Sequence, residues 1–184
     1  MTSSAGKLLI AIPELPDSNF YRTVVFVIEH SDEGAMGVIL NRPTNVKLSE
    51  LWEKLHFDSD VTSGDAVHLG GPVEGPVLAL HDQLRISDVE VIEQVFMTMN
   101  GERLNELVME NKGRMKVFSG YSGWGPGQLE MEIESGGWLL TDAKPADIFD
   151  SSESMWKRVC EQFGQEIMFP SGIHHDKQID PGLN

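Results

Sequence analysis

The chain has 184 residues, of which 40% are hydrophobic and 23% are charged, and its 29 acidic and 14 basic residues give a net charge of −15. This composition predicts one soluble globular domain, and no apolar run approaches the roughly 20 residues that a membrane-spanning helix needs. The charge argues against general affinity for nucleic acid or anionic membranes, because that affinity depends on clustered cations.

The cellular compartment is predicted by two simple features. The chain contains a single cysteine, Cys160, so no internal disulfide can form. Residues 1–7 lack the basic start and apolar centre of a signal peptide. Both features favour a cytoplasmic, reducing location. Cys160 falls on the apolar stripe of a predicted helix, which favours a core thiol over a redox sensor.

The first half of the chain is predicted to consist mostly of strands. The segment RTVVFVIE over 22–29 is dense in β-branched residues, and the short turn after it predicts an antiparallel hairpin with the next apolar run, which Pro43 ends. Apolar residues at helical spacing over 48–55 predict one helix in this half of the chain. The expected elements are strands over 6–12, 22–29 and 36–40, a helix over 48–55, and strands over 67–69 and 77–80.

The second half mixes helices with short strands. After the glycine-rich turn, good helix formers from Pro126 onward favour a helix, although strict alternation of apolar residues is also present. The expected elements are a strand over 89–95, a helix over 100–111, strands over 116–119 and 138–141, and a helix over 154–163. Irregular order of strands and helices predicts a single α+β domain over 1–164. Loss of periodicity predicts a flexible tail over 165–184.

The segment KVFSGYSGWGPGQLEME over 116–132 joins a strand to this helix through a turn rich in glycine. A hydrolase places its nucleophilic serine on such a turn, with glycine two residues away on each side. Here Trp124 occupies one of those positions around Ser122, and the histidine that follows in hydrolase order, His174, falls in the tail. The pattern favours a structural turn, and ligand binding stays open because a helix starting near Gly127 presents unpaired N–H groups.

Two other turns hold the remaining candidate residues. Arg42, within NRP, either pins a loop by donating to carbonyl groups or clamps a carboxylate or phosphate with its planar fork. The segment HLGGPV over 68–73 forms either a tight structural turn or the wall of a cleft. The candidate ligand-binding residues are Asn41, Arg42, Gly70, Gly71, Gly120, Ser122, Gly123, Trp124, Gly125 and Gly127.

Metal and cofactor chemistry is not predicted. The chain has no HExxH sequence and no paired CxxC. Three histidines, His30, His68 and His81, fall at strand ends, where a hydrogen-bonded structural histidine is more common than a ligand. We therefore predict no catalytic residue, no metal site and no cofactor.

Four ordered stretches of the chain resemble the AlgH/YqgE family of bacterial proteins. They are GKLLIAIPELPDSNFYRTVVFVIEH, GAMGVILNRP, HLGGPV and FSGYSGWGPGQLEMEI, and the similarity covers about residues 6–164. The resemblance implies an α+β domain with a mixed, strongly bent and partly barrel-like sheet flanked by helices. It implies the family label of transcriptional regulator but no established catalytic residue, and similar proteins usually carry alanine where Ser122 stands.

These observations predict a non-enzymatic regulatory or binding domain with a cleft for a small anion, in which Arg42 lies near the 120–127 turn. The alternative is an enzyme, such as a hydrolase, that acts on a small anionic substrate. The expected partner is a small anionic ligand or another protein. Direct binding to nucleic acid or to a membrane is not expected.

Overall fold

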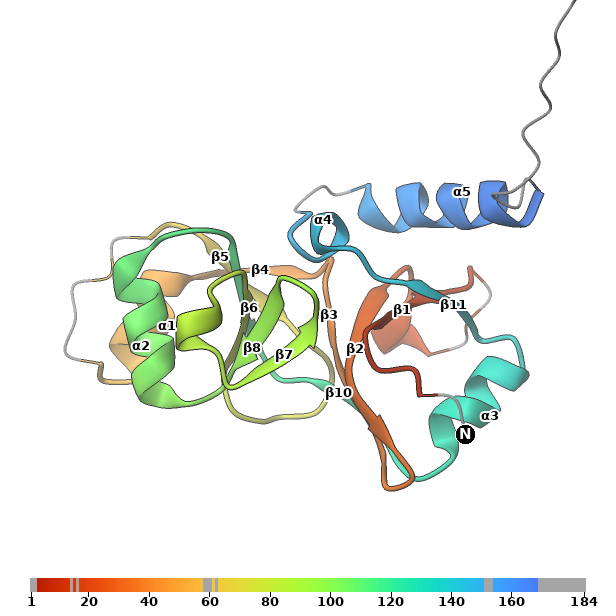
Figure 1. Cartoon of the computed structure of the whole chain (residues 1–184), viewed down its shortest axis with the longest axis horizontal. Helices are drawn as coiled ribbons and strands as arrows, with labels where there is room; N and C mark the ends of the chain where they lie inside the picture. Colours follow the sequence, from red (N-terminus) through yellow and green to blue (C-terminus); the bar gives the residue numbers. More distant parts are fainter. Residues whose placement is uncertain are drawn as a thin grey trace, which may run out of the picture.

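The computed structural model describes residues 3–13, 15, 17–57, 61, 63–150 and 154–168, which form two sheets with helices packed around them (Figure 1). The first sheet has the strand order β10-β3-β2-β1-β11 and is antiparallel throughout. Its strands are β1 (Lys7–Ala11), β2 (Val24–Ser31), β3 (Gly34–Ile39), β10 (Ser122–Trp124) and β11 (Trp138–Asp142).

The second sheet has the order β4-β5-β9-β6-β8-β7, and only its β5–β9 pair is parallel. Its strands are β4 (Pro43–Lys47), β5 (Ala66–Leu69), β6 (Leu78–His81), β7 (Val89–Ile92), β8 (Val95–Thr98) and β9 (Met115–Ser119). Both sheets are open, so the fold is the predicted mixed α+β type but its barrel-like part is not closed.

The helices cover the outer faces of both sheets and one end of the molecule (Figure 1). They are η1 (Ser18–Phe20), α1 (Leu48–Lys54), η2 (Leu84–Ile86), α2 (Gly101–Glu110), α3 (Gln128–Glu134), α4 (Pro145–Ile148) and α5 (Met155–Met168). The side chain of Asn100 caps α2 by accepting N–H groups of its first turn, and Asn111 ends it in the left-handed conformation.

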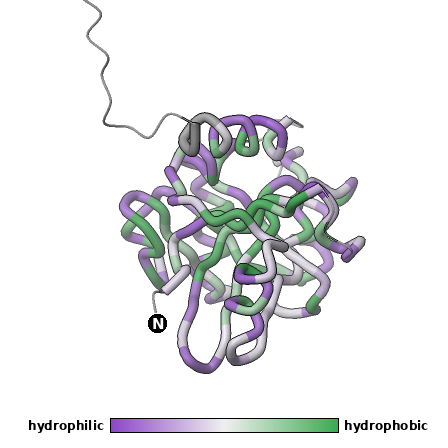
Figure 2. The backbone as a smooth tube through the Cα atoms, turned by 90° about the vertical axis from the view of Figure 1, so that its right-hand side faces the viewer, coloured by the Kyte–Doolittle hydropathy of each residue, from purple (hydrophilic) through white to green (hydrophobic). Residues whose placement is uncertain are grey.

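One hydrophobic core is shared by the two sheets. Alternate residues of β1, Leu8 and Ile10, contact it from the first sheet, while Leu78, Leu80 and Phe118 contact it from the second. The residues between them face outward, because successive side chains of a strand point to opposite faces. The outward residues form one cluster with α3 and another with α1 and α2. Figure 2 shows the hydrophobic stretches of the chain gathered in the middle of the fold.

The two sheets are joined where three backbone segments meet, 39–42, 69–73 and 119–122, which we call the junction. The N–H of Gly70 donates to the carbonyl of Ser119 (3.0 Å), and the Gly70 carbonyl accepts the N–H of Ile39 (2.9 Å). Each of these bonds links one strand end to another, so the junction fixes the relative positions of the ends of β3, β5 and β9.

The junction requires glycine because its backbones approach too closely for a side chain. A Cβ atom on Gly70 would lie 2.2 Å from the carbonyl oxygen of Gly120, and one on Gly71 would lie 2.3 Å from the carbonyl oxygen of Tyr121. Both obstacles are backbone atoms, which cannot rotate away. The glycines in HLGGPV and FSGYSGW therefore pack against each other, although they are about 50 residues apart in the chain.

Most predicted elements are confirmed, and the differences have local causes. The predicted strand over 89–95 is two strands, β7 and β8, because Gln94 takes a positive φ of 63° and reverses the chain. Strand β3 ends before Pro43, as predicted, but Pro43 also starts β4, which was not predicted. An edge strand tolerates a residue without an N–H donor. Helix α5 continues past Gly164 to Met168, and residues 169–184 of the predicted tail lie outside the described residues.

We expect Gly70→Ala to lower the free energy of unfolding by about 1–3 kcal/mol or more, because the new methyl group meets backbone. Gly64→Ala is the matched control, since a Cβ at Gly64 meets nothing within 4 Å. Its effect should stay within about 0.5 kcal/mol. Urea denaturation of both variants measures the difference, and equal midpoints would contradict the close approach at Gly70.

Candidate functional site

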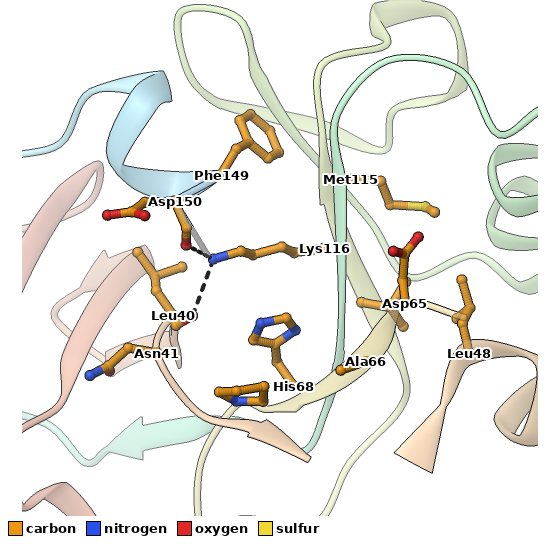
Figure 3. Close-up of a pocket in the computed structure, with 12 residues that line it drawn as sticks. Leu40, Asn41, Leu48, Asp65, Ala66, His68, Met115, Lys116, Phe149 and Asp150 are labelled. Atoms are coloured by element: carbon orange, nitrogen blue, oxygen red, sulfur yellow. Dashed lines mark hydrogen bonds between the residues drawn. The ribbon is translucent and has the colours of Figure 1, made fainter. Parts of the chain in front are cut away.

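A pocket of about 450 Å³ opens beside the junction, between the second sheet and the segment after α4 (Figure 3). We call it the lysine pocket. Its lining residues are Leu40, Asn41, Pro43, Leu48, Asp65, Ala66, His68, Met115, Lys116, Val117, Phe149 and Asp150.

Strand alternation explains why a lysine and a histidine meet in this pocket. Phe118 of β9 belongs to the shared core, so Lys116, two residues earlier, lies on the same face of the sheet. His68 of β5 pairs with Phe118 in the parallel register, and their rings lie 5.6 Å apart. Two polar residues therefore occupy positions where the strand pattern calls for apolar ones.

Lys116 is a buried cation that is held by carbonyl groups. The residue is 6% exposed, and its Nζ donates to the carbonyl of Leu40 (3.2 Å) and to that of Asp150. Burial lowers the pKa of Lys116 to about 8, against the opposing charge of Asp150. Within the described part of the chain, no carboxylate oxygen comes within ion-pair distance of Nζ. A positive charge at pH 7 is thus held without a paired anion from the part of the chain that the structure describes.

His68 lies beside this lysine and is 9% exposed. Its Nδ1 atom is buried and has no hydrogen-bond partner among the residues that the structure describes. Burial lowers the pKa of His68 to about 4, the charge of Lys116 adds to the effect, and the Ala66 carbonyl opposes it. The ring is therefore neutral at pH 7 and can donate one hydrogen bond and accept another.

The acidic residues of the pocket are engaged elsewhere. The Asp150 carboxylate accepts from Arg158 at 2.7 and 3.2 Å, and Asp65 accepts from the hydroxyl of Ser63 at 2.7 Å. Figure 3 shows the Asp65 carboxylate near Met115, on the far side of the pocket from the Lys116 ammonium group. The end of the pocket at Lys116 is accordingly positive.

A second pocket of about 510 Å³ lies beside α3 on the outer side of the first sheet. We call it the tryptophan pocket. Its lining residues are Ile12, Leu15, Asp17, Phe20, Pro72, Gly123, Trp124, Gln128, Glu132, Ser135, Gly137 and Trp138.

The residues proposed from the NRP sequence have structural partners. The side chain of Asn41, which lines the lysine pocket, accepts the N–H of Val24 and donates to the carbonyl of Arg22, both at 2.9 Å. Arg42 donates to the carbonyl of Tyr21 at 2.8 Å and does not line either pocket. Arg42 thus holds the loop before β2.

The glycine-turn candidates divide between two places. Gly70, Gly71 and Gly120 lie in the junction, as does Ser122, whose hydroxyl is fully buried and donates to the Gly70 carbonyl (3.0 Å). The others lie toward α3: Gly123 and Trp124 line the tryptophan pocket, the N–H of Gly125 donates to Gln128 Oε1 (3.0 Å), and Gly127 precedes α3 in the left-handed conformation.

Residues outside the predicted set complete both pockets. Lys116, His68, Glu132 and Trp138 were not predicted as ligand-binding. A polar residue at a strand position could have indicated Lys116 and His68, and the sequence holds no such signal for Glu132 and Trp138. The expectation of satisfied histidines is confirmed for His30, which accepts the N–H of Ser4 through Nδ1 and contacts Glu130 through Nε2. For His81 it holds only for Nδ1, which accepts the N–H of Gln83 (3.2 Å), while the buried Nε2 has no partner among the described residues. His68 Nδ1 is buried and likewise has no partner among them.

Other chemistry has little support in the described ranges. They contain no group of three or more histidine, cysteine, aspartate or glutamate residues placed to hold a metal ion. None of their helices is both long enough and apolar enough to cross a membrane. Burial raises the pKa of the Cys160 thiol, which opposes formation of a reactive thiolate. His174 lies outside the described residues.

Comparisons with known proteins place the chain in a family. Residues 8–168 match the family described as AlgH-like. A UPF0301 protein of Ruegeria pomeroyi is 38% identical over 90% of this chain and 95% of its own, and one of Chlorobium limicola is 39% identical over 97% and 95%.

Solved structures agree with this assignment. The solution structure of the AlgH protein from Pseudomonas aeruginosa has a TM-score of 0.76 at 27% identity, covering 94% of this chain and 96% of that one. A crystal structure of a protein from Corynebacterium diphtheriae has a TM-score of 0.70 at 26% identity, covering 88% and 87%. The chain therefore belongs to the AlgH-like family of UPF0301 proteins.

Proposed function

We propose that this protein is a regulatory binding domain whose ligand is a small anion held in the lysine pocket. The observation that carries the proposal is the buried Lys116, whose ammonium group faces the pocket and forms an ion pair with no carboxylate among the described residues. Buried charges are normally paired, since an unpaired one loses hydration without compensation. A carboxylate or phosphate group entering the pocket would supply the missing anion.

The two polar residues of the pocket suit such a ligand. Two N–H groups of Lys116 are held by the carbonyls of Leu40 and Asp150, which leaves the third for a ligand oxygen. His68 adds a donor or an acceptor at the same end of the pocket. A volume of about 450 Å³ falls in the range of small-molecule sites.

The net charge of −15 does not prevent anion binding at this place. Charges farther away than about 8–10 Å are screened at physiological ionic strength. Lys116 is buried and would act on a ligand at contact distance, so its attraction is screened much less.

Binding without catalysis agrees best with the position and hydrogen bond of the candidate nucleophile, Ser122. The Ser122 hydroxyl is buried and donates to a backbone carbonyl, so it is not presented to either pocket. Regulation through a metabolite or protein partner is more compatible with an acidic surface than direct contact with DNA.

Catalysis on a small anionic substrate is the second candidate function, and one observation favours it. Lys116 and His68 both have strongly shifted pKa values and share a pocket, as catalytic groups often do. In that case His68 would act as a base on a substrate that Lys116 holds. Turnover of a bound anion, lost in His68→Phe, would distinguish this function from binding alone.

We expect Lys116→Met to weaken sulfate binding at least tenfold, because it removes the only lysine or arginine among the described residues that line the pocket and keeps a side chain of similar length. His68→Phe should weaken it by a smaller factor, through loss of a neutral hydrogen bond. Isothermal titration calorimetry gives the affinities, and Lys54→Met, which removes an exposed lysine outside the pocket, is the control. Equal affinity in the Lys116 and Lys54 variants would contradict the site, provided both give folded spectra.

The affinity for sulfate should fall roughly tenfold between about pH 7 and about pH 9, because free Lys116 loses its proton as the pH passes its pKa of about 8. The bound anion favours the protonated lysine, so affinity is complete below that pKa and is lost above it. Sulfate keeps a constant charge over this range, and His68, with a pKa of about 4, stays neutral. A flat profile would show that Lys116 is not the binding cation.

We expect no sequence-specific DNA binding at about 150 mM salt, because specific binders reach nanomolar affinity through clustered cations and this chain carries a net charge of −15. Electrophoretic mobility shift with genomic fragments is the measurement. A specific shift with submicromolar affinity would overturn the indirect mode of regulation.

A further inference from the structure

The tryptophan pocket differs from the lysine pocket in charge and in chemistry. Three aromatic residues, Phe20, Trp124 and Trp138, line it together with the carboxylates of Asp17 and Glu132. None of its lining residues within the described part of the chain is lysine, arginine or histidine. The pocket is therefore both aromatic and negative.

Glu132 is the centre of this arrangement. Its Oε2 atom accepts the indole N–H of Trp124 (3.0 Å) and of Trp138 (2.8 Å), and its Oε1 accepts the side-chain amide of Gln128 (2.9 Å). All three donors are neutral. These bonds fix the carboxylate in place, but within the described residues they bring no cation to balance its charge.

The three aromatic rings pack against one another beside this charge. Phe20 and Trp124 stack with ring centroids 6.1 Å apart, and Trp138 meets each of them edge-on, at 5.2 Å from Phe20 and 6.2 Å from Trp124. Aromatic surfaces attract cations, most strongly those that lose little hydration on entering. A negative charge and aromatic surface in one cavity are the two components of known sites for alkylated ammonium groups.

We propose that the tryptophan pocket binds a small organic compound with an alkylated ammonium group. A metal ion suits the pocket less well, because hard cations need several free oxygen ligands and Glu132 Oε2 already accepts two N–H groups. A neutral apolar ligand would leave Glu132 and Asp17 without a counter-charge. A volume of about 510 Å³ accommodates a small molecule rather than a polypeptide segment.

The site is independent of the lysine pocket, with which it shares no lining residue. The two pockets select ligands of opposite charge. Failure of anion binding at Lys116 therefore leaves this inference unaffected, and the reverse also holds.

Choline and 3,3-dimethylbutan-1-ol test the proposal, because they have nearly the same shape and differ in the positive charge. The readout is the indole N–H signals in nitrogen-15 spectra recorded at constant ionic strength. We expect choline to shift the signals of Trp124 and Trp138 in a saturable way, with a millimolar or tighter Kd. Trp52 and Trp156 donate to Asn105 and Ala11, outside the pocket, and should not move.

Three variants distinguish binding in the pocket from general attraction to an acidic protein. Glu132→Gln removes the central charge and keeps an oxygen acceptor for the indoles, so it should weaken choline binding at least fivefold. Glu134→Gln, which makes the same change at an exposed site of α3, should alter binding by less than twofold. Asp17→Asn should weaken binding without touching the indole contacts, which keeps the test valid if Glu132→Gln disturbs the fold.

Three outcomes would overturn the proposal. One is absence of a saturable shift at Trp124 and Trp138. Another is equal affinity for choline and the neutral alcohol, which would mean an apolar pocket without charge selection. The third is equal loss of binding in the Glu132 and Glu134 variants, which would indicate nonspecific attraction by the net negative charge.

Discussion

The close backbone contact at the junction is the constraint on which the rest of the structure depends. Two strand ends, from β5 and β9, meet at Gly70 and Gly120 with no space for a side chain between them. The Gly70 carbonyl accepts two hydrogen bonds at once, from Ile39 and from Ser122. Because these bonds connect one sheet to the other, the relative position of the sheets, and of the shared core between them, follows from this contact.

Both pockets lie next to the junction and follow from it. On one side the lysine pocket is lined by Leu40 and Asn41 of the junction together with the buried residues Lys116 and His68, which lie on the face of the second sheet that carries the core residue Phe118. On the other side the chain continues from Ser122 into β10, and Trp124 turns beneath α3 to form the wall of the tryptophan pocket. A turn that resembles a catalytic elbow in the sequence is thus an architectural element, and both pockets lie beside it.

Local patterns predicted most of the fold. The β-branched run of β2 and the apolar stripes of α1 and α2 were sufficient to predict these elements, because the periodicity of apolar residues indicates which face is buried. The split of β7 and β8 was missed because a positive φ at Gln94 leaves no clear signal in the sequence. That Lys116 and His68 line the same pocket was harder to predict. The two residues are 48 positions apart in the chain and meet only through the parallel β5–β9 pair. A lysine inside a predicted strand was the one available hint.

Direct titration of the Lys116 side chain by nuclear magnetic resonance tests the central claim most directly. Free protein should show an ammonium group that titrates near pH 8, because burial disfavours its charge. Addition of sulfate should move this pKa upward, as an anion in contact stabilises the protonated form. Two results would contradict the proposal that the buried Lys116 binds an anionic ligand. One is a Lys116 pKa near the ordinary value of about 10.4, and the other is a pKa that sulfate leaves unchanged.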